Sequence, residues 1–353
     1  MSVILDDYTQ IADILAENQV KKPFLCCGKS FQQTALFSYL KQYNIVVFDR
    51  IRPNPRFEDM VTATELFLSE GCDFMIAAGG GSPMDSAKMI RLMVTNGTEN
   101  ALTQPMENND IKSLFIPTTA GTGSEATKSS VFYVHEKEKL SIANLDFLPD
   151  YILFDETLLE TLPDYQRKAT CLDALCHSIE SYWSKKATEE SREYAAKSIR
   201  LFFEHKDSYM NNERAGNRGM LMASYYGGKA IHLTGTTAPH VLCYNITMNC
   251  STAHGHSVAV VLAKLWYFML ERDYPAETLT ALAQLMGGKT PQDGAVIFAG
   301  LLTEFGLPYP RVSEEMLDGF TAKVNTAKLQ SNPIPLTAND VRELYRRVLC
   351  DGV

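Results

Sequence analysis

The spacing of apolar and polar residues changes character partway along this chain. Up to Asp155, short apolar runs alternate with stretches whose apolar positions recur at helical spacing. We interpret the apolar runs as buried strands at 23–27, 45–48, 74–78, 114–116 and 151–154, with amphipathic helices at 30–43 and 57–69. This alternation predicts a parallel, doubly wound α/β sheet. Beyond Asp155 helical spacing takes over, so we predict an α/β domain over residues 1–155 and an all-helical domain over 156–353.

Two loops rich in small residues follow predicted strands. The first, at 79–85, contains three glycines that let the backbone approach a ligand, and Ser82, Pro83 and Asp85 stand where an N-cap, a first helical residue and a capping-box acid are expected. The second, at 116–125, is dominated by small and hydroxyl residues. The first loop alone is compatible with a plain strand–helix turn, and it is neither a G-x-G-x-x-G motif nor a P-loop. Two such loops favour a dinucleotide at the carboxyl ends of the strands.

Histidines gather in the second half of the chain. His240, His254 and His256 are three of only seven, and upstream Asp173 and His177 lie four residues apart on one face of a predicted helix. One carboxylate with neutral imidazoles is a ligand set for Fe(II) or Zn(II) rather than for Ca or Mg. Asp173, His177, His240 and His254 therefore form a candidate four-ligand site, with His256 close by in the sequence. The alternative is that each has an ordinary polar partner, and the residues alone leave both interpretations open.

Composition restricts the compartment and the partners. The chain has 353 residues, and its net charge of -9 argues against non-specific binding to nucleic acid or to anionic membranes. The first residues carry acids where a secretory signal would carry Lys or Arg, and the longest apolar runs are shorter than a membrane span. The eight cysteines show no Cys-x-x-Cys spacing, and most lie among apolar residues, which is typical of reduced thiols in a cytoplasm. We therefore expect a cytoplasmic protein.

Taken together, both halves resemble the iron-containing (group III) alcohol dehydrogenase family over nearly the whole chain. The resemblance rests on the segments 52–55, 79–85, 117–125, 173–180 and 253–255. It implies a dehydroquinate synthase-like architecture, in which a nucleotide-binding domain precedes a helical metal-binding domain with the active site in the cleft between them. It also implies that Asp173, His177, His240 and His254 bind Fe(II) or Zn(II), and that the protein is a homodimer.

The resemblance further implies a nicotinamide cofactor, NADP or NAD, and a hydride transfer beside a metal that acts as a Lewis acid on the substrate oxygen. The candidate cofactor-binding residues are Gly28, Lys29, Ser30, Gly79, Gly80, Gly81, Ser82, Asp85, Thr118, Thr119, Thr122, Ser124 and Lys139. For Lys139 the alternative is an exposed lysine at a strand end. Many NAD-specific members carry an aspartate at the position of Gly28. Here Gly-Lys-Ser offers room, a cation and a donor to a 2′-phosphate, so we expect NADPH to be preferred.

Departures from the family pattern bear on proton transfer. Many members carry a histidine, often assigned to proton transfer, where this chain has Tyr244, and Ala253 replaces the usual proline. The chain adds His256, so His256 and Tyr244 are the candidate catalytic residues. We predict that His256 relays protons, contacts substrate or supports a ligand, and the sequence leaves these three roles open.

The segments 240–247, 254–260 and 331–337 are similar to the phosphonoacetaldehyde reductase (hydroxyethylphosphonate dehydrogenase) branch. That similarity predicts reduction of phosphonoacetaldehyde to 2-hydroxyethylphosphonate, with His256, Lys264 and Lys328 as candidate partners of the phosphonate. The alternatives are a reductase of small uncharged aldehydes or glycerol-type polyols, and a dehydroquinate synthase-like lyase. Asp173 argues against the lyase, which normally has a glutamate at the first ligand position.

Overall fold

The computed structural model describes residues 2–102, 107, 109–135, 138–272 and 274–351. The chain forms two compact units. The first comprises residues 1–119 and 123–161, and the second comprises 120–122 and 162–353. The chain thus enters the second unit for three residues before returning to the first. The domain boundary predicted after residue 155 stays a prediction, because compactness alone does not define where a domain ends.

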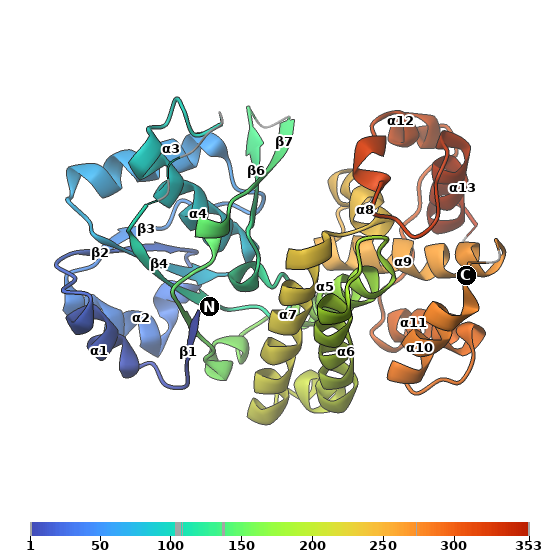
Figure 1. Cartoon of the computed structure of the whole chain (residues 1–353), viewed down its shortest axis with the longest axis horizontal. Helices are drawn as coiled ribbons and strands as arrows, with labels where there is room; N and C mark the ends of the chain where they lie inside the picture. The colour runs from blue at the N-terminus through green and yellow to red at the C-terminus, as the bar shows by residue number, and fades with distance from the viewer. Residues whose placement is uncertain (1, 103–106, 108, 136–137, 273, 352–353) are drawn as a thin grey trace. The chain divides into compact units, whose positions relative to one another are not determined.

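The first unit is built on a six-stranded parallel sheet with the strand order β1-β8-β5-β4-β2-β3 (Figure 1). The strands are β1 (Val3–Leu5), β2 (Pro23–Cys27), β3 (Val46–Phe48), β4 (Phe74–Gly79), β5 (Lys112–Pro117) and β8 (Tyr151–Leu153). This arrangement confirms the predicted parallel α/β class. The edge strand β1 was not predicted, because Val3 and Ile4 are both exposed and three residues carry little periodicity.

Alternate residues of the central strands are buried on both faces of this sheet. Phe24 and Cys26 belong to a core that includes residues of the helices α3 and α4, while Leu25 and Cys27 are equally buried on the other face. The helices of this unit are α1 (Gln10–Glu17), α2 (Ala35–Leu40), α3 (Phe57–Ser69) and α4 (Gly81–Asn96), with 3-10 turns η1 (Phe31–Gln33), η2 (Lys41–Tyr43), η3 (Ser124–Ala126), η4 (Leu145–Phe147) and η5 (Glu156–Leu159). Burial on both faces explains why the strands read as continuous apolar runs rather than as alternating ones.

Two local expectations for this unit were wrong. The stretch 30–43 is not one helix, because Thr34 is extended (φ -88°, ψ 157°) and its hydroxyl accepts a hydrogen bond from the Phe37 N–H, which starts α2 afresh. An antiparallel hairpin of β6 (Ser129–Val134) and β7 (Glu138–Ala143) also went unpredicted. Its inner face carries Phe132, which packs into the core beside α3 and α4, and the partly buried Val134, Leu140 and Ile142 pack against that core.

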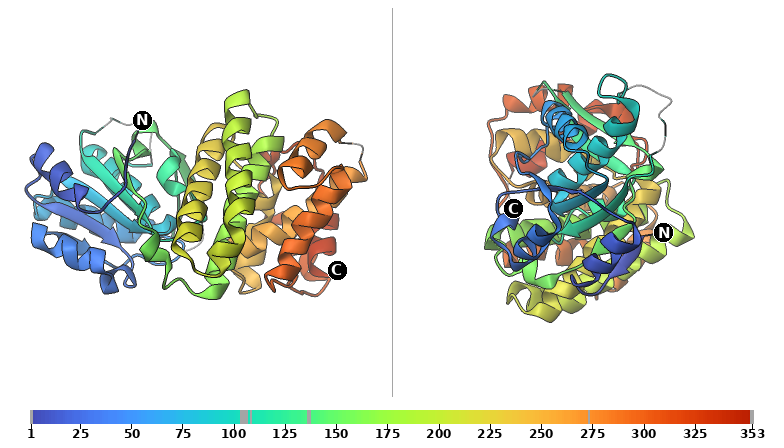
Figure 2. Two further views of the ribbon diagram at one scale, coloured as in Figure 1. Left: turned by 90° about the horizontal axis from the view of Figure 1, so that it is seen from below. Right: turned by 90° about the vertical axis from the view of Figure 1, so that its left-hand side faces the viewer.

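Within its described residues the second unit is helical throughout, as predicted. Its helices are α5 (Asp164–Trp183), α6 (Glu189–Met210), α7 (Arg214–Thr234), α8 (Ala238–Asn249), α9 (His254–Leu270), α10 (Ala276–Leu285), α11 (Pro291–Glu304), α12 (Met316–Ala322) and α13 (Ala338–Leu349), with the 3-10 turn η6 (Thr326–Leu329). Three long helices, α5, α6 and α7, pack side by side (Figures 1 and 2). Capping boxes built on Thr188, Thr290 and Thr337 start α6, α11 and α13.

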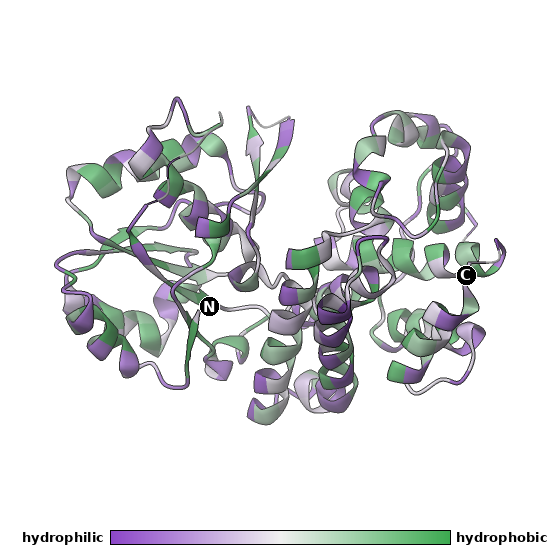
Figure 3. Cartoon of the chain, viewed as in Figure 1, coloured by the Kyte–Doolittle hydropathy of each residue, from purple (hydrophilic) through white to green (hydrophobic). Residues whose placement is uncertain are grey.

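Helix α9 lies at the centre of the second unit. Every residue from Gly255 to Ala263 is buried, and the helix is coloured as mainly hydrophobic in Figure 3. A helix that is apolar on all sides must be enclosed by others, and α5, α8, α11 and α13 all contact it. Across the described residues, none of the helices combines the length and the apolar character needed to cross a membrane.

Candidate metal centre and nucleotide loops

One face of α5 carries the first part of the candidate site. Asp173, His177 and Glu180 follow at positions i, i+4 and i+7, so they line a single stripe of the helix. All three are buried, and the helix around them is filled by leucine, alanine and cysteine. Because isolated polar groups are costly in such surroundings, each needs a partner supplied from another element.

Three imidazoles converge on one carboxylate oxygen. The Nε2 atoms of His177, His240 and His254 lie 4.0, 3.3 and 3.8 Å from Asp173 Oδ1. The rings of His177 and His240 stack with centroids 4.5 Å apart, and His254 meets His240 edge-on at 5.3 Å. Ligand atoms of Asp173, His240 and His254 all lie within 4.8 Å of one another, and His177 borders this group. The structure therefore brings together all four residues that the sequence predicted as ligands.

The other ring nitrogen of each histidine has a contact that points away from this group. His240 Nδ1 lies 2.5 Å from Glu180 Oε1, His177 Nδ1 lies 3.3 Å from the Gly121 carbonyl oxygen, and His254 Nδ1 lies 3.7 Å from Cys243 Sγ. A carboxylate and a carbonyl only accept, so in the neutral imidazoles of His240 and His177 Nδ1 carries the proton and Nε2 keeps its lone pair. Such outer partners fix the tautomer and the orientation of metal-binding histidines.

Glu180 belongs to this cluster, and sequence reasoning missed it. Its Oε1 accepts from His240, and its Oε2 accepts from the Thr237 N–H at 2.6 Å and from the Thr237 hydroxyl at 2.9 Å. The carboxylate therefore ties the start of α8, where His240 lies, to the ligand stripe of α5. Its spacing of seven residues from Asp173 was the signal that could have identified it.

Two buried polar atoms of this cluster indicate whether its residues fit a metal ion. Among the described residues, neither Asp173 Oδ1 nor His240 Nε2 has a hydrogen-bond partner. Leaving buried acceptors unpaired is costly, and a cation between them satisfies both. Neutral imidazoles and one carboxylate are the donor set of Fe(II) and Zn(II) sites, so the residues fit such an ion.

The charges of the cluster point the same way. Burial by itself raises the pKa of the Asp173 carboxyl, but the imidazoles of His177, His254 and His240 outweigh burial and hold that pKa well below its usual range. Burial alone would lower the pKa of His240, yet the carboxylates of Glu180 and Asp173 raise it to about 9. The site thus attracts positive charge strongly, whether a proton or a metal ion that replaces the proton.

His256 lies near the cluster but has both ring nitrogens engaged. Its Nε2 lies 2.8 Å from the Pro308 carbonyl oxygen and its Nδ1 lies 3.1 Å from the Tyr165 hydroxyl. The side chain is buried, and burial lowers the pKa of the imidazole. Tyr244 is half-buried on α8, one turn after His240. The catalytic roles of His256 and Tyr244 stay predictions, and the contacts of His256 favour the third predicted role, support of a ligand.

Candidate cofactor-binding residues follow three neighbouring strands of the sheet. Strands β2, β4 and β5 lie side by side and run parallel, so 28–30, 79–82 and 118–119 lie at the same edge. The Thr118 N–H donates to the Gly79 carbonyl at 2.9 Å, and a Cβ on Gly80 would lie 3.3 Å from Thr119 Oγ1. Gly79 itself has φ +156°, and a Cβ there would lie 2.4 Å from Pro83 Cγ, so glycine is required. The structure thus places these candidate cofactor residues together.

The expected capping box at the start of α4 is wrong. The helix begins at Gly81 with Gly80 as its N-cap, so Ser82 lies inside the first turn rather than before it. The side chain of Asp85 does not cap the helix. Its Oδ1 accepts from the Ser124 hydroxyl at 2.7 Å, and its Oδ2 accepts from the Val131 N–H at 3.0 Å. Direct contact of Asp85 and Ser124 with the cofactor stays a prediction, and the structure shows that they bind each other.

Lys88, a second residue that sequence reasoning missed, lies next to that pair. Its side chain is completely buried on α4, and its ammonium donates to the Ser124 carbonyl, the Ser124 hydroxyl and the Ser129 carbonyl, all at 2.8 Å. The candidate Lys139 lies on β7 opposite Tyr133, and Thr122 belongs to the second unit. Their contacts with a cofactor stay predictions.

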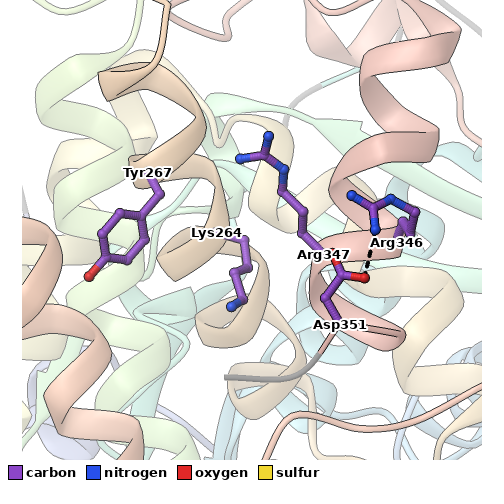
Figure 4. A pocket seen from close by; sticks show the side chains of 5 residues that line it. All are labelled: Lys264, Tyr267, Arg346, Arg347 and Asp351. Atoms are coloured by element: carbon purple, nitrogen blue, oxygen red, sulfur yellow. Dashed lines mark hydrogen bonds and ion pairs between the residues drawn. The ribbon is translucent and has the colours of Figure 1, made fainter.

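The candidate phosphonate partners lie outside the metal cluster. Lys264 lines a cavity of about 310 Å³ together with Tyr267, Arg346, Arg347 and Asp351 (Figure 4). None of these five residues is a candidate metal ligand. Lys264 also follows His254 by ten residues on α9, which separates their backbones by about 15 Å along the helix axis. Lys328 is exposed on η6.

Comparison with known proteins agrees with this geometry in both halves of the chain. Residues 5–156 match the family described as "Iron-containing alcohol dehydrogenase", and residues 168–349 match "Fe-containing alcohol dehydrogenase family, C-terminal". The chain therefore belongs to the iron-containing alcohol dehydrogenase family and is an oxidoreductase.

Individual relatives are distant. Long-chain-alcohol dehydrogenase 1 of Geobacillus thermodenitrificans (strain NG80-2) is 27% identical over 86% of this chain and 82% of its own length. Phosphonoacetaldehyde reductase of Streptomyces viridochromogenes (strain DSM 40736 / JCM 4977 / BCRC 1201 / Tue 494) is 27% identical over 74% of this chain and 72% of its own. The crystal structure of sulfoacetaldehyde reductase from Bifidobacterium kashiwanohense in complex with NAD+ superposes with a TM-score of 0.91 and 23% identity, covering 99% and 97% of the two chains, and it shows the shared fold.

Proposed function

We propose that this protein is a metal-dependent, NAD(P)-linked alcohol dehydrogenase that works as an aldehyde reductase. The observation that supports it most is the convergence of three imidazole Nε2 atoms on Asp173 Oδ1, with two buried atoms of that cluster unpaired. Asp173, His177, His240 and His254 are the proposed ligands. Family membership supports the same class of reaction.

The residues of the chain would contribute mainly by orientation. A divalent ion held by these residues would supply Lewis acidity toward the substrate oxygen, and a bound nicotinamide would supply or take the hydride. Glu180 holds the His240 imidazole and the Gly121 carbonyl holds that of His177, so both present Nε2 toward Asp173. The loops after β2, β4 and β5 offer backbone N–H groups and hydroxyls to the cofactor phosphates.

For the substrate we propose phosphonoacetaldehyde, reduced to 2-hydroxyethylphosphonate. Support comes from the segments 240–247, 254–260 and 331–337 and from the 27% identity to a protein named phosphonoacetaldehyde reductase. A second candidate is a small uncharged aldehyde. Two observations favour the uncharged aldehyde. Lys264 lies about 15 Å along α9 from His254, and Lys328 is exposed, so neither cation lies beside the proposed metal ligands.

Steady-state kinetics on metal-reconstituted protein test both levels of this proposal. We expect NADPH oxidation with phosphonoacetaldehyde to exceed that with propanal or butanal by at least about tenfold in kcat/KM, or about 1.4 kcal/mol of transition-state binding. His254→Ala should abolish turnover of every aldehyde, because three ligands leave a weakly binding site. Equal kcat/KM values for phosphonoacetaldehyde and the uncharged aldehydes would contradict the phosphonate assignment alone. Full activity of His254→Ala would refute the metal site.

We further propose that NADPH is preferred over NADH, that the protein is a homodimer and that it works in a cytoplasm. The Gly28-Lys29-Ser30 sequence supports the first, and the family resemblance supports the second. The third is supported by the apolar context of most of the eight cysteines, all of which are free thiols in the structure.

A further inference from the structure

The first turn of α9 is tied down on both sides of His254. Ala253 is the N-cap of the helix, and its own side chain cannot cap. The hydroxyl oxygen of Tyr165, in the first turn of α5, accepts the Ala253 N–H at 2.9 Å. The same hydroxyl lies 3.1 Å from His256 Nδ1, with the two rings edge-on. One phenol therefore contacts the residue before His254 and the residue two positions after it.

The donors and acceptors of this chain of contacts can be assigned. The Pro308 carbonyl only accepts, so His256 Nε2, 2.8 Å away, carries the proton. In the neutral imidazole Nδ1 is then an acceptor and receives the Tyr165 O–H. The phenol oxygen in turn accepts from Ala253. Each polar atom has a partner of the right kind, and neither ring nitrogen of His256 is left over for a substrate.

Close packing sets this turn against α5. A Cβ on Gly255 would lie 2.0 Å from the Ala169 carbonyl oxygen and 2.8 Å from Asp173 Cβ, so the backbones touch there. The His254 side chain nevertheless remains 43% exposed. Its ring meets His240 edge-on and lies near Cys243 Sγ, and the backbone of residues 253–256 sets where His254 Nε2 lies relative to Asp173.

We propose that Tyr165 and His256 are positioning residues for the metal ligand His254, which they hold through the backbone of the first turn of α9. This inference rests on the proposed function, since it assumes that His254 binds a metal. It assigns no proton exchange to His256. The role is one of rigidity: the Tyr165 hydroxyl joins Ala253 to His256, and the Pro308 carbonyl anchors the other side of the imidazole.

Metal affinity is the direct measurement. Tyr165→Phe removes one oxygen and leaves the ring, while Tyr226→Phe is a matched control that removes a hydroxyl bonded at 2.8 Å to Lys197 between α6 and α7. Each protein is stripped of metal and titrated with Zn(II) against a competing chelator, and the visible absorption of its Co(II) form is recorded. We expect Tyr165→Phe to weaken Zn(II) binding by about tenfold to a hundredfold and to change the Co(II) spectrum. Tyr226→Phe should retain the affinity and the spectrum of the wild type.

His256→Gln provides a second variant, because glutamine can still donate to Pro308 but does not hold an acceptor rigidly at the Nδ1 position. It should weaken Zn(II) binding in the same direction, with the melting temperature of the metal-free protein close to that of Tyr226→Phe. Wild-type affinity and spectrum in both Tyr165→Phe and His256→Gln would overturn the inference. So would wild-type affinity combined with a shifted pH profile of kcat, which would make His256 a proton relay. Failure of the proposed function looks different: wild type and His254→Ala would then bind Zn(II) equally.

Discussion

Gly28 is the position at which we expect an added side chain to change the preference between NADPH and NADH. It follows β2 with ordinary backbone geometry, and a Cβ built there meets no atom within 4 Å. Aspartate can therefore be introduced without strain. Its carboxylate would accept from a ribose 2′-hydroxyl and repel a 2′-phosphate.

We predict that Gly28→Asp shifts the ratio of kcat/KM for NADPH over NADH toward NADH by about tenfold or more, equivalent to about 1.4 kcal/mol. Gly28→Asn has nearly the same shape without the charge and should shift the ratio far less. The ratio is measured with one aldehyde at one ionic strength. A wild-type enzyme that already strongly prefers NADH would contradict the argument.

Residues that act through their own chemistry were easier to predict than residues that act through others. Asp173 and His254 have side chains of the types that can bind metals, so their type and spacing were informative. Glu180 and Tyr165 matter because of which atoms they meet, Thr237 and His240 for the first, Ala253 and His256 for the second. Those pairings join different helices, so the sequence does not show them; only the spacing of Glu180 from Asp173 on α5 could have drawn attention to that residue.

At the scale of elements, the buried ammonium of Lys88 fastens α4 to the segment that follows β5. It bonds Ser124 and Ser129, and Asp85 completes the contact through the Ser124 hydroxyl. Although desolvation lowers the pKa of Lys88, the acceptors around it and the carboxylates of Asp85 and Glu125 favour the charged form. The loop with the candidate residue Ser124 therefore depends on a helix that starts at the other candidate loop.

We predict that Lys88→Met lowers the free energy of unfolding by about 3 kcal/mol, because it leaves buried carbonyls without a donor. The control is Lys112→Met, whose ammonium pairs with Asp150 while the side chain is 52% exposed, and which should cost less than about 1 kcal/mol. Urea denaturation followed by circular dichroism measures both. Equal losses for the two variants would mean that the buried contacts of Lys88 contribute no more than a surface pair.

Elements were predicted well where burial imposes a strong pattern. Helix α3 spans the predicted 57–69, and the apolar runs at 23–27 and 74–78 are central strands. In strand β7 Leu140 and Ile142 alternate with polar residues, but none of its residues is fully buried and the pattern is short, so the strand went unpredicted. The interruption of 30–43 is set by one Thr34 side chain, which sequence periodicity does not register.

For the molecule as a whole, one buried acid makes stability depend on pH. Glu125 is buried, and within the described chain its Oε2 has no hydrogen-bond partner. Burial raises the pKa of this carboxyl to about 7, an effect that its own backbone N–H and Lys88 reduce but do not cancel. Between about pH 4.3, the usual pKa of Glu, and pH 7, the folded protein binds a proton that the unfolded chain releases, so raising the pH destabilises the fold.

We predict that wild-type protein loses up to about 3 kcal/mol of unfolding free energy through this group as pH rises from 5 to 8. Glu125→Gln keeps the size of the side chain and cannot ionise, so its stability should fall less over the same range and exceed that of the wild type at pH 8. Denaturant unfolding at the two pH values measures the difference. Parallel pH dependence in both proteins would show that Glu125 is already ionised in the fold near pH 5.

The three residues 120–122 determine whether the two units of the chain can be separated into independent fragments. They belong to the second unit although they lie in sequence inside the first, and Gly121 supplies the carbonyl that accepts from His177. A Cβ on Gly121 would lie 2.6 Å from the Thr170 carbonyl oxygen, so the tripeptide is fitted closely to α5. No single cut of the gene separates the two units: a fragment beginning at residue 162 lacks the backbone that orients one of its own candidate ligands. Recombination between distant relatives at that junction would pair each helical half with a foreign tripeptide, so the two halves are expected to be inherited together rather than exchanged as modules.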